Sequence, residues 1–430
     1  MTPGGHPMTL GRFLTALAFA ACASAQPDFD LLIKGGHVID SKNKLNAVRD
    51  IAIKAGKIAA VDANIPASRA SKVVDASGLY VTPGLVDIHV HVYPGLVRNS
   101  YAGGSFGLQP DGFTLRSGVT TVADAGSSGW RNFEDFKTRI IDNQKTRVLA
   151  FLNIVGAGMG PGQIEQNLED MEVKPAADTA IKYKGTIVGI KSAHFNGPEW
   201  TPYINAEEVG KIAHIPVMVD FGGNVRAGRT LYDLLTKYFR RGDIFTHMYG
   251  GRRGEQDAET KGPSQAMVEG RKRGVIFDVG HGNGSFLWNC AVPVMKAGFI
   301  PDSISTDLHY ASMMGGMKDM LNVMDKFLAL GMPLDEVILR STWNPAKEIQ
   351  HEELGHLSVG APADIAVLRL EKGKFGFIDQ IGGKLEGTQK LDCELTLRDG
   401  VVVYDLNGMA ATPWEKLPVQ PLPTPRSPAK

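Results

Sequence analysis

The central part of the chain, residues 82–350, alternates short β-branched runs with helical hydrophobic patterns, and this alternation restricts the fold more than any other feature. Strands that alternate with helices form parallel sheets, because each helix carries the chain back to the same edge. The candidate strands are residues 86–92, 119–123, 149–155, 187–191, 217–221, 244–247, 275–279 and 303–307. The pattern predicts an α/β fold with a (β/α)8 TIM barrel over residues 82–350; a doubly wound parallel sheet is the alternative.

The two ends of the chain have a different texture. Residues 27–80 and 352–410 contain short alternating apolar runs separated by turn residues, which is typical of small antiparallel strands. Neither end has enough strands for a stable sheet of its own. We therefore predict one composite β domain, a small β-sandwich built from both ends. Residues 413–430 are rich in proline and have little to bury, so we expect a disordered tail.

The first 25 residues are typical of a signal peptide. Arg12 precedes an apolar run over residues 13–22, and small residues follow at 23–25. The run is shorter than the roughly 20 residues that cross a bilayer, although a buried first helix, a membrane anchor and lipid attachment at Cys22 are alternatives. We expect a cleaved signal over residues 1–25 and an exported protein, periplasmic or secreted, with no membrane span.

The charge balance bears on the partners. Lys and Arg together number 46, as do Asp and Glu, so no net field is available to attract nucleic acid or an anionic membrane. The chain is 43% hydrophobic and 21% charged, which is ordinary for a globular enzyme. We expect a small-molecule substrate and no nucleic-acid partner, and the oligomeric state stays open.

Ligand-type residues lie at the ends of several predicted strands, where barrels place their catalytic groups. These residues are His89, His91, Lys191, Asp220, His247 and Asp307. Side chains alternate along a strand, so His89 and His91 share a face and can hold one ion together. An HxH pair alone is weak evidence, because a strand with two solvent-facing histidines looks the same. The ligand-type residues at four other strand ends favour a metal site.

Lys191 and Asp307 need separate explanations. An ammonium group would repel a cation, so Lys191 fits a metal site if carbon dioxide converts it to a carbamate; an ion pair with Asp220 or Asp307 is the alternative. Asp307 is a candidate general base that accepts the proton of a metal-bound water. Its alternative role is the N-cap of a following turn.

Several short motifs of the chain resemble those of the amidohydrolase superfamily, in its deacetylase branch near D-aminoacylases and dihydroorotases. They are VTPGLVDIHVH at 81–91, GVTTV at 118–122, GIK at 189–191, TH at 246–247, DVGHG at 278–282, STDLH at 305–309 and NPA at 344–346. The resemblance spans about residues 30–410. It implies a site for two metal ions, zinc by expectation, with His89, His91, carbamylated Lys191, His247 and Asp307 as ligands and a hydroxide between the ions.

One position departs from the family pattern. The fifth strand of the family carries a histidine ligand, whereas this chain has Asp220, and His214 is too far back along the strand to replace it. A carboxylate can also bind zinc, so Asp220 remains a candidate ligand. Its charge favours harder ions such as Mn or Mg. Loss of the second ion is the alternative.

Five further residues are candidates for contact with substrate. His281 lies in a glycine-rich turn and is predicted to contact substrate, with a purely structural histidine as the alternative. His309 is predicted to bind substrate and to orient Asp307. Any one of Arg252, Arg226 and Arg253 could hold a substrate carboxylate through a bidentate pair, and Arg252 is the predicted contact.

The sequence thus predicts a metal-dependent hydrolase that cleaves an amide, or an ester of similar shape, by attack of a metal-bound hydroxide. The resemblance favours deacylation of N-acyl amino acids or acetylated small acids. A cyclic-amide hydrolase of the dihydroorotase type is an alternative. A secreted barrel that binds a ligand without turnover is another.

Overall fold

A computed structural model describes the chain except for residues 3, 5–26, 95–106, 161–162, 223–227 and 419–430. The predicted apolar run of the signal peptide, Arg226 and most of the predicted tail lie outside the described residues. Of that tail, Trp414–Lys416 form an exposed 3-10 turn. Among the described helices, none is long and apolar enough to cross a membrane.

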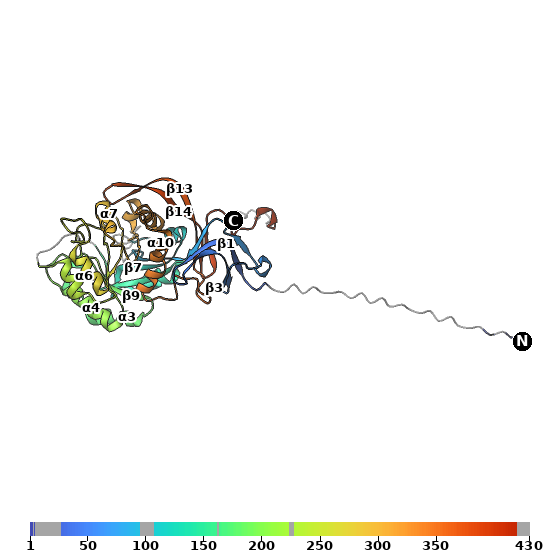
Figure 1. The fold of residues 1–430 in the computed structure, drawn as a ribbon. Coiled ribbons are helices and arrows are strands. Elements are labelled where there is room, and N and C mark those ends of the chain that lie inside the picture. Colours follow the sequence, from blue (N-terminus) through green and yellow to red (C-terminus); the bar gives the residue numbers. More distant parts are fainter. Residues whose placement is uncertain (3, 5–26, 95–106, 161–162, 223–227, 419–430) are drawn as a thin grey trace, which may run out of the picture.

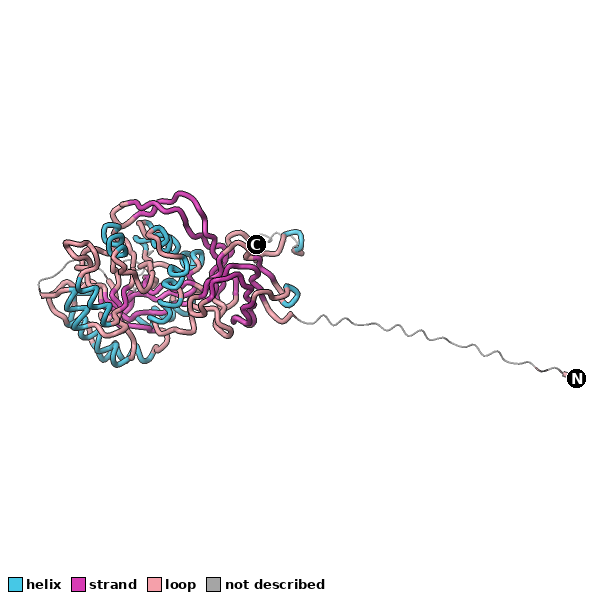
Figure 2. The backbone as a smooth tube through the Cα atoms, in the orientation of Figure 1, coloured by secondary structure: helices cyan, strands magenta, loops and turns pink. Residues whose placement is uncertain are grey.

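A curled parallel sheet occupies the middle of the chain, and its strands are hydrogen-bonded to one another in sequence order. The strands are β6 (Leu85–Val90), β7 (Val119–Gly129), β8 (Arg147–Asn153), β9 (Ile187–Ser192), β10 (Val217–Val219), β11 (Ile244–Phe245) and β12 (Ile276–Phe277). Almost all of their residues are buried, as expected for parallel strands that are covered on both faces. Helices surround this sheet in Figures 1 and 2.

The predicted eighth strand, residues 303–307, is not a regular strand in the structure. Isolated parallel bridges join Asp278 to Ser303 and Val90 to Leu308. The His91 amide donates to the Leu308 carbonyl at 2.8 Å, so the segment contacts β6 as well as the end of β12. Its hydroxyl side chains bond to buried carboxylates, and Asp307 has a φ of 52°, which interrupts an extended ladder.

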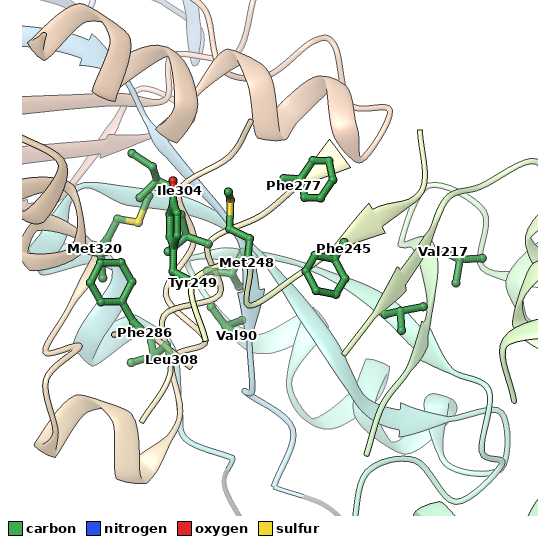
Figure 3. Close-up of a cluster of buried hydrophobic side chains, with 14 of the residues drawn as sticks. Val90, Val217, Phe245, Met248, Tyr249, Phe277, Phe286, Ile304, Leu308 and Met320 are labelled. Atoms are coloured by element: carbon green, nitrogen blue, oxygen red, sulfur yellow. The ribbon is translucent and has the colours of Figure 1, made fainter. Parts of the chain in front are cut away.

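Helices follow most of these strands and cover the outer face of the sheet. They are α1 (Asp111–Thr114), α2 (Phe133–Arg139), α3 (Val173–Lys182), α4 (Thr201–Ala213), α5 (Leu231–Asp233), α6 (Gln265–Arg273), α7 (Trp288–Lys296), α8 (Tyr310–Met314), α9 (Met320–Ala329), α10 (Leu334–Ser341) and α11 (Trp343–Glu348). Ser264 caps α6 by accepting from the Met267 amide. Apolar side chains of the strands and loops, such as Phe245 and Phe277, pack into the core shown in Figure 3.

The two chain ends meet in a second, mixed sheet. Its strands are β1 (Leu31–Asp40), β2 (Leu45–Lys54), β3 (Lys57–Asp62), β4 (Val73–Asp75), β5 (Tyr80–Pro83), β13 (Ile365–Ile378), β14 (Lys384–Arg398) and β15 (Val401–Asp405). They form one continuous sheet rather than the two sheets of a sandwich, because β5 pairs in parallel with β1 and antiparallel with β13. Ile33 and Val38 share a hydrophobic core with Ile365 and Leu395.

The mixed sheet is joined closely to the parallel sheet. Only Gly84 separates β5 from β6, and a Cβ at this position would lie 2.2 Å from Thr120 Oγ1, so only glycine fits. The β13–β14 hairpin extends over the helices beside α7 in Figure 1. Trp288 Nε1 of α7 donates to the carbonyls of Phe377 (3.1 Å) and Gly383 (3.0 Å), which fixes the hairpin there.

Asp325 of α9 provides a pH-dependent contact with the hairpin, because its carboxylate accepts from the Leu391 amide at 2.8 Å. Burial raises its pKa to about 8, so the folded protein retains a proton between about pH 4 and 8 that the unfolded chain releases. Stability from this group therefore falls as pH rises through that window. We expect Asp325→Asn to gain stability over wild type from pH 5 to pH 8.5, by about 2 °C or more in Tm. A constant Tm difference between pH 5 and pH 8.5 in thermal scans would contradict this.

Candidate metal centre

A cavity of about 120 Å³ opens where the parallel strands end. Its lining consists of His89, His91, Met159, Lys191, His194, Asp220, His247, Asp307 and His309. All six predicted metal-site residues therefore line one cavity. A larger hollow of about 370 Å³ lies near the beginnings of β10 and β11, where it is lined by His214 and Asp243, and it is remote from these groups.

Three buried side chains of the cavity are close enough to hold one cation. One ligand atom from each of His89, His247 and Asp307 lies within 4.8 Å of the others. Asp307 Oδ1 is 3.7 Å from His89 Nε2 and 3.2 Å from His91 Nε2. Burial raises the pKa of Asp307, but the neighbouring histidines outweigh burial and hold the pKa below its ordinary value. The carboxylate is therefore ionised and available to a cation or a proton.

The hydrogen bonds behind two histidines leave them in the form that binds metal. His89 Nδ1 is 2.8 Å from Thr246 Oγ1, and that hydroxyl donates to Asp278 at 2.7 Å, so Nδ1 must be the donor to Thr246. His247 Nδ1 donates to the Gly280 carbonyl at 2.5 Å. In both neutral rings Nε2 therefore carries the lone pair and faces the cavity. This donor set fits a divalent cation.

Asp278 is a residue that the sequence did not assign to the site. Its carboxylate accepts hydrogen bonds from Thr246, Ser303 and Ser305, at 2.7 to 2.8 Å. It thereby connects the end of β11, the end of β12 and the 303–308 segment beneath His89. The DVGHG motif marked the position, but only the contacts reveal its positioning role.

Lys191 is fully enclosed among the candidate ligands. Its Nζ lies 3.3 Å from His89 Nε2 and 3.7 Å from Met218 Sδ. Burial lowers the pKa of Lys191, against the opposing effect of Asp220 and Asp307. The described residues show no direct ion pair between Lys191 and Asp220 or Asp307; Asp220 contacts Arg253, and Asp307 contacts His91.

Asp220 is a buried carboxylate with a buried cation beside it. Arg253 Nη2 donates to Asp220 Oδ1 at 3.1 Å. Burial raises the pKa of Asp220, but Arg253 and His247 outweigh burial and hold the pKa well below its ordinary value. Arg252, the predicted substrate contact, is exposed and does not line the cavity. Of the candidate arginines that the structure describes, Arg253 is the one that contacts a cavity residue, Asp220.

His194 lines the cavity although the sequence did not single it out. It lies on the loop that follows β9, with a φ of 55°, and its ring lies between Glu165 Oε2 (3.0 Å) and Asp220 Oδ2 (3.1 Å). Burial alone would lower the pKa of His194, but the two carboxylates outweigh burial and raise the pKa to about 10, so the ring is an imidazolium between them in the metal-free protein. The only sequence signal was its place three residues after Lys191.

The other two predicted histidines differ in position. His281 is fully buried, stacks on Phe286 and bonds to the Gly282 carbonyl and to Lys326 Nζ, so it does not reach the cavity and its predicted substrate contact is not available. His309 does line the cavity.

His309 differs from the other histidines in its tautomer. Its Nδ1 accepts from the Ala311 amide at 3.2 Å, so in the neutral ring Nε2 carries the proton, 3.9 Å from Asp307 Oδ2. This residue, rather than Asp307, is the N-cap of α8. The capping alternative for Asp307 is therefore wrong for this helix.

Comparisons with known proteins agree with this geometry. The model of the Amidohydrolase family matches residues 289–403. A deacetylase from Agrobacterium fabrum is 32% identical over 322 residues, which cover 73% of this chain and 76% of the relative. A deacetylase from Enterococcus faecalis is 28% identical over 364 residues, covering 83% and 94%. A dihydroorotase from Citrifermentans bemidjiense is 32% identical over 158 residues, which are 36% of each chain.

Solved structures give the same architecture. The crystal structure of an adenine deaminase superposes with a TM-score of 0.80 at 28% identity, covering 88% of this chain and 100% of the other. The crystal structure of a dihydroorotase gives 0.74 at 27%, covering 87% and 99%. The curled sheet with its helices corresponds to a TIM-barrel-like domain, joined to a β-rich domain.

The position of Lys191 leads to a test of its chemical form. If the amine becomes a carbamate that binds metal, Lys191→Ala loses metal and lowers turnover by about 100-fold or more, and formate or acetate restores part of both. Lys191→Arg is the matched control, because it keeps the positive charge but does not form the carbamate, and it should lose metal as well. Full metal content in Lys191→Arg, measured by elemental analysis, would show that only the cation matters.

Proposed function

Because this chain belongs to the amidohydrolase family, and is therefore a hydrolase of carbon–nitrogen bonds other than peptide bonds, we propose that it is a metal-dependent deacylase of small N-acyl acids. This proposal rests chiefly on the cavity in which His89, His91, Lys191, His247 and Asp307 converge. The deacetylase relatives, which match about three quarters or more of this chain, support the type of reaction.

The cavity residues would hold one or two divalent ions, zinc or manganese, with Lys191 as the carbamate. When bound, such ions make water acidic enough to act as a nucleophile and polarise the carbonyl of the substrate. Asp307 then accepts the proton of the attacking water, because its ionised carboxylate already lies among the histidines. The same group delivers the proton to the departing nitrogen, so that an amine leaves and a carboxylic acid remains.

His309 contributes a different function in this proposal. Its Nε2 carries a proton toward the cavity, so it donates a hydrogen bond where the other histidines offer lone pairs. A donor of this kind suits the carboxylate or carbonyl oxygen of an N-acyl acid. Met159 adds an apolar side chain to the lining, which suits a short acyl group.

The fold supports this assignment in one further respect. We propose that residues 303–308 complete a (β/α)8 barrel as its eighth position, on the basis of the bridges to Val90 and Asp278. Asp307 then occupies the same ring of strand ends as His89 and His247, which is where barrels carry their catalytic groups.

The expected substrate range defines the main experiment. Purified protein loaded with zinc or manganese should release acetate from N-acetyl amino acids or acetylated hydroxy acids, and Asp307→Asn should lower kcat by about 1,000-fold because an amide cannot accept the proton. Leu308→Val, an apolar change beside it, is the control. Turnover of dihydroorotate alone would favour the cyclic-amide alternative. A metal-loaded protein inactive on all three classes would favour the binding barrel.

Export is a second proposal, and it rests on the sequence of residues 1–25 alone. Expression of the full chain in a bacterial host should yield periplasmic protein whose intact mass corresponds to a chain that begins at Gln26. A cytoplasmic product that retains Met1 would contradict the signal peptide.

A further inference from the structure

We propose that His194, on the loop after β9, supplies the ligand of the second metal position that the fifth strand lacks. The position would be formed by His194, Asp220 and His247, beside carbamylated Lys191. His247 would then serve this ion, and the first ion would be left to His89, His91 and Asp307. This inference rests on the proposed metal-dependent function, but it concerns which residues hold the second ion. In this proposal, Asp220 and His194 together replace the single histidine that the family carries at the fifth strand.

The two oxygens of Asp220 have different surroundings. Oδ1 accepts hydrogen bonds from the Gly222 amide at 2.9 Å and from Arg253 Nη2 at 3.1 Å. Oδ2 instead lies 3.1 Å from His194 Nε2 and 3.3 Å from His247 Nε2. The first oxygen is thus supplied with donors from the protein. The second is the oxygen toward which two imidazole nitrogens converge.

Both of these imidazoles are held from behind by acceptors. His247 donates from Nδ1 to the Gly280 carbonyl, and His194 Nδ1 lies 3.0 Å from Glu165 Oε2. A ring that donates from Nδ1 presents Nε2 to the site, and histidines that bind metal are usually held by a carbonyl or carboxylate in this way. Displacement of the proton between His194 Nε2 and Asp220 Oδ2 would leave three lone-pair atoms at one place, and one cation would then satisfy all three.

The two distances that start from Asp220 Oδ2 agree with this assignment. Tetrahedral zinc with ligands at about 2.0 to 2.1 Å separates neighbouring ligand atoms by about 3.3 Å. The two distances from Asp220 Oδ2 are 3.1 and 3.3 Å.

The loop that carries His194 is fixed on both sides. Gln166 Nε2 donates to the His194 carbonyl at 2.9 Å, and Gln166 Oε1 accepts from the Asn196 amide at 2.7 Å. Arg229 Nη2 donates to the Phe195 carbonyl at 3.0 Å. His194 also has a left-handed backbone, with a φ of 55° against 65° at His247 and 52° at Asp307. A residue held in this conformation by its neighbours is pre-organised for binding.

Arg253 makes the exchange of histidine for aspartate electrostatically feasible. An aspartate adds a negative charge where the family carries a neutral imidazole, and the buried Arg253 guanidinium on Oδ1 balances it. Glu255 Oε1 lies 3.6 Å from the other side of Arg253, which moderates repulsion between the guanidinium and an ion at Oδ2. The charge of the whole position therefore stays suited to a divalent cation.

A proton on His194 would compete with the metal ion for the second position. An imidazolium bridging Glu165 and Asp220 would fill the second position with a proton, and the chain would then bind one metal ion per molecule. The two cases differ in metal count, which can be measured without any assay of turnover.

The test is a titration of metal-free full-length protein with Zn²⁺ and Co²⁺, followed by calorimetry, elemental analysis and the visible spectrum of the cobalt form. We expect two equivalents in wild type and one in His194→Ala, with the affinity of the second equivalent reduced by about 100-fold or more and its cobalt spectral change lost. Glu165→Gln, which keeps an acceptor but removes the charge, should weaken the second equivalent by about tenfold.

His309→Ala is the matched control, because His309 is a cavity histidine with the opposite tautomer and should keep both equivalents. Two equivalents of wild-type affinity in both His194→Ala and Glu165→Gln would overturn the inference. A wild-type protein that binds one equivalent and still deacylates would also overturn it while leaving the proposed function standing. A wild-type protein that binds no metal would refute the proposed function itself.

Discussion

The site depends on two buried carboxylates that hold the segment 303–308 against two elements of the curled sheet, β6 and the end of β12. Asp87 of β6 accepts from the amide and hydroxyl of Thr306, and Asp278 accepts from Ser303 and Ser305. Such buried charges are stable only when donors surround them. The donors come from the segment that carries Asp307, so the same bonds link this segment to β6 and to the end of β12 and place Asp307 beside His89.

Sequence periodicity was sufficient to find the cavity because parallel strands end at a common edge. The ends of the apolar runs predicted that four ligand-type residues lie at one edge of the sheet. These residues line one cavity in the structure: His89, Lys191, His247 and Asp307. The same reasoning predicted an eighth strand where hydroxyl side chains pair with carboxylates instead. It also predicted a sandwich, because alternation cannot reveal that β5 bonds to strands from both chain ends.

The periodicity of apolar residues does not predict where the side chains of loop residues point. His194 and Arg253 lie after strands, and their roles appear only when Asp220 is seen between them. His281 shows the opposite error, since a glycine-rich turn suggested a substrate contact, whereas the ring is buried against Lys326. Arg252 is exposed and does not line the cavity. A side chain beyond the last strand residue is oriented by contacts with distant loops, which one sequence does not contain.

The two metal positions inferred here differ in exposure, and this difference follows from where their ligands come from. His89 lies in β6 and His91 directly follows that strand, and their side chains are 1% and 6% exposed, whereas the side chain of His194 is 45% exposed. An ion between strand residues is enclosed by the fold, while an ion that relies on a loop histidine faces the mouth of the cavity. The proposed second position would therefore lie nearer the mouth of the cavity, and it should exchange its ion more readily than the first. Because the proposed second position relies on His194 as well as on Asp220, its occupancy by metal should depend on how well ordered the loop after β9 is.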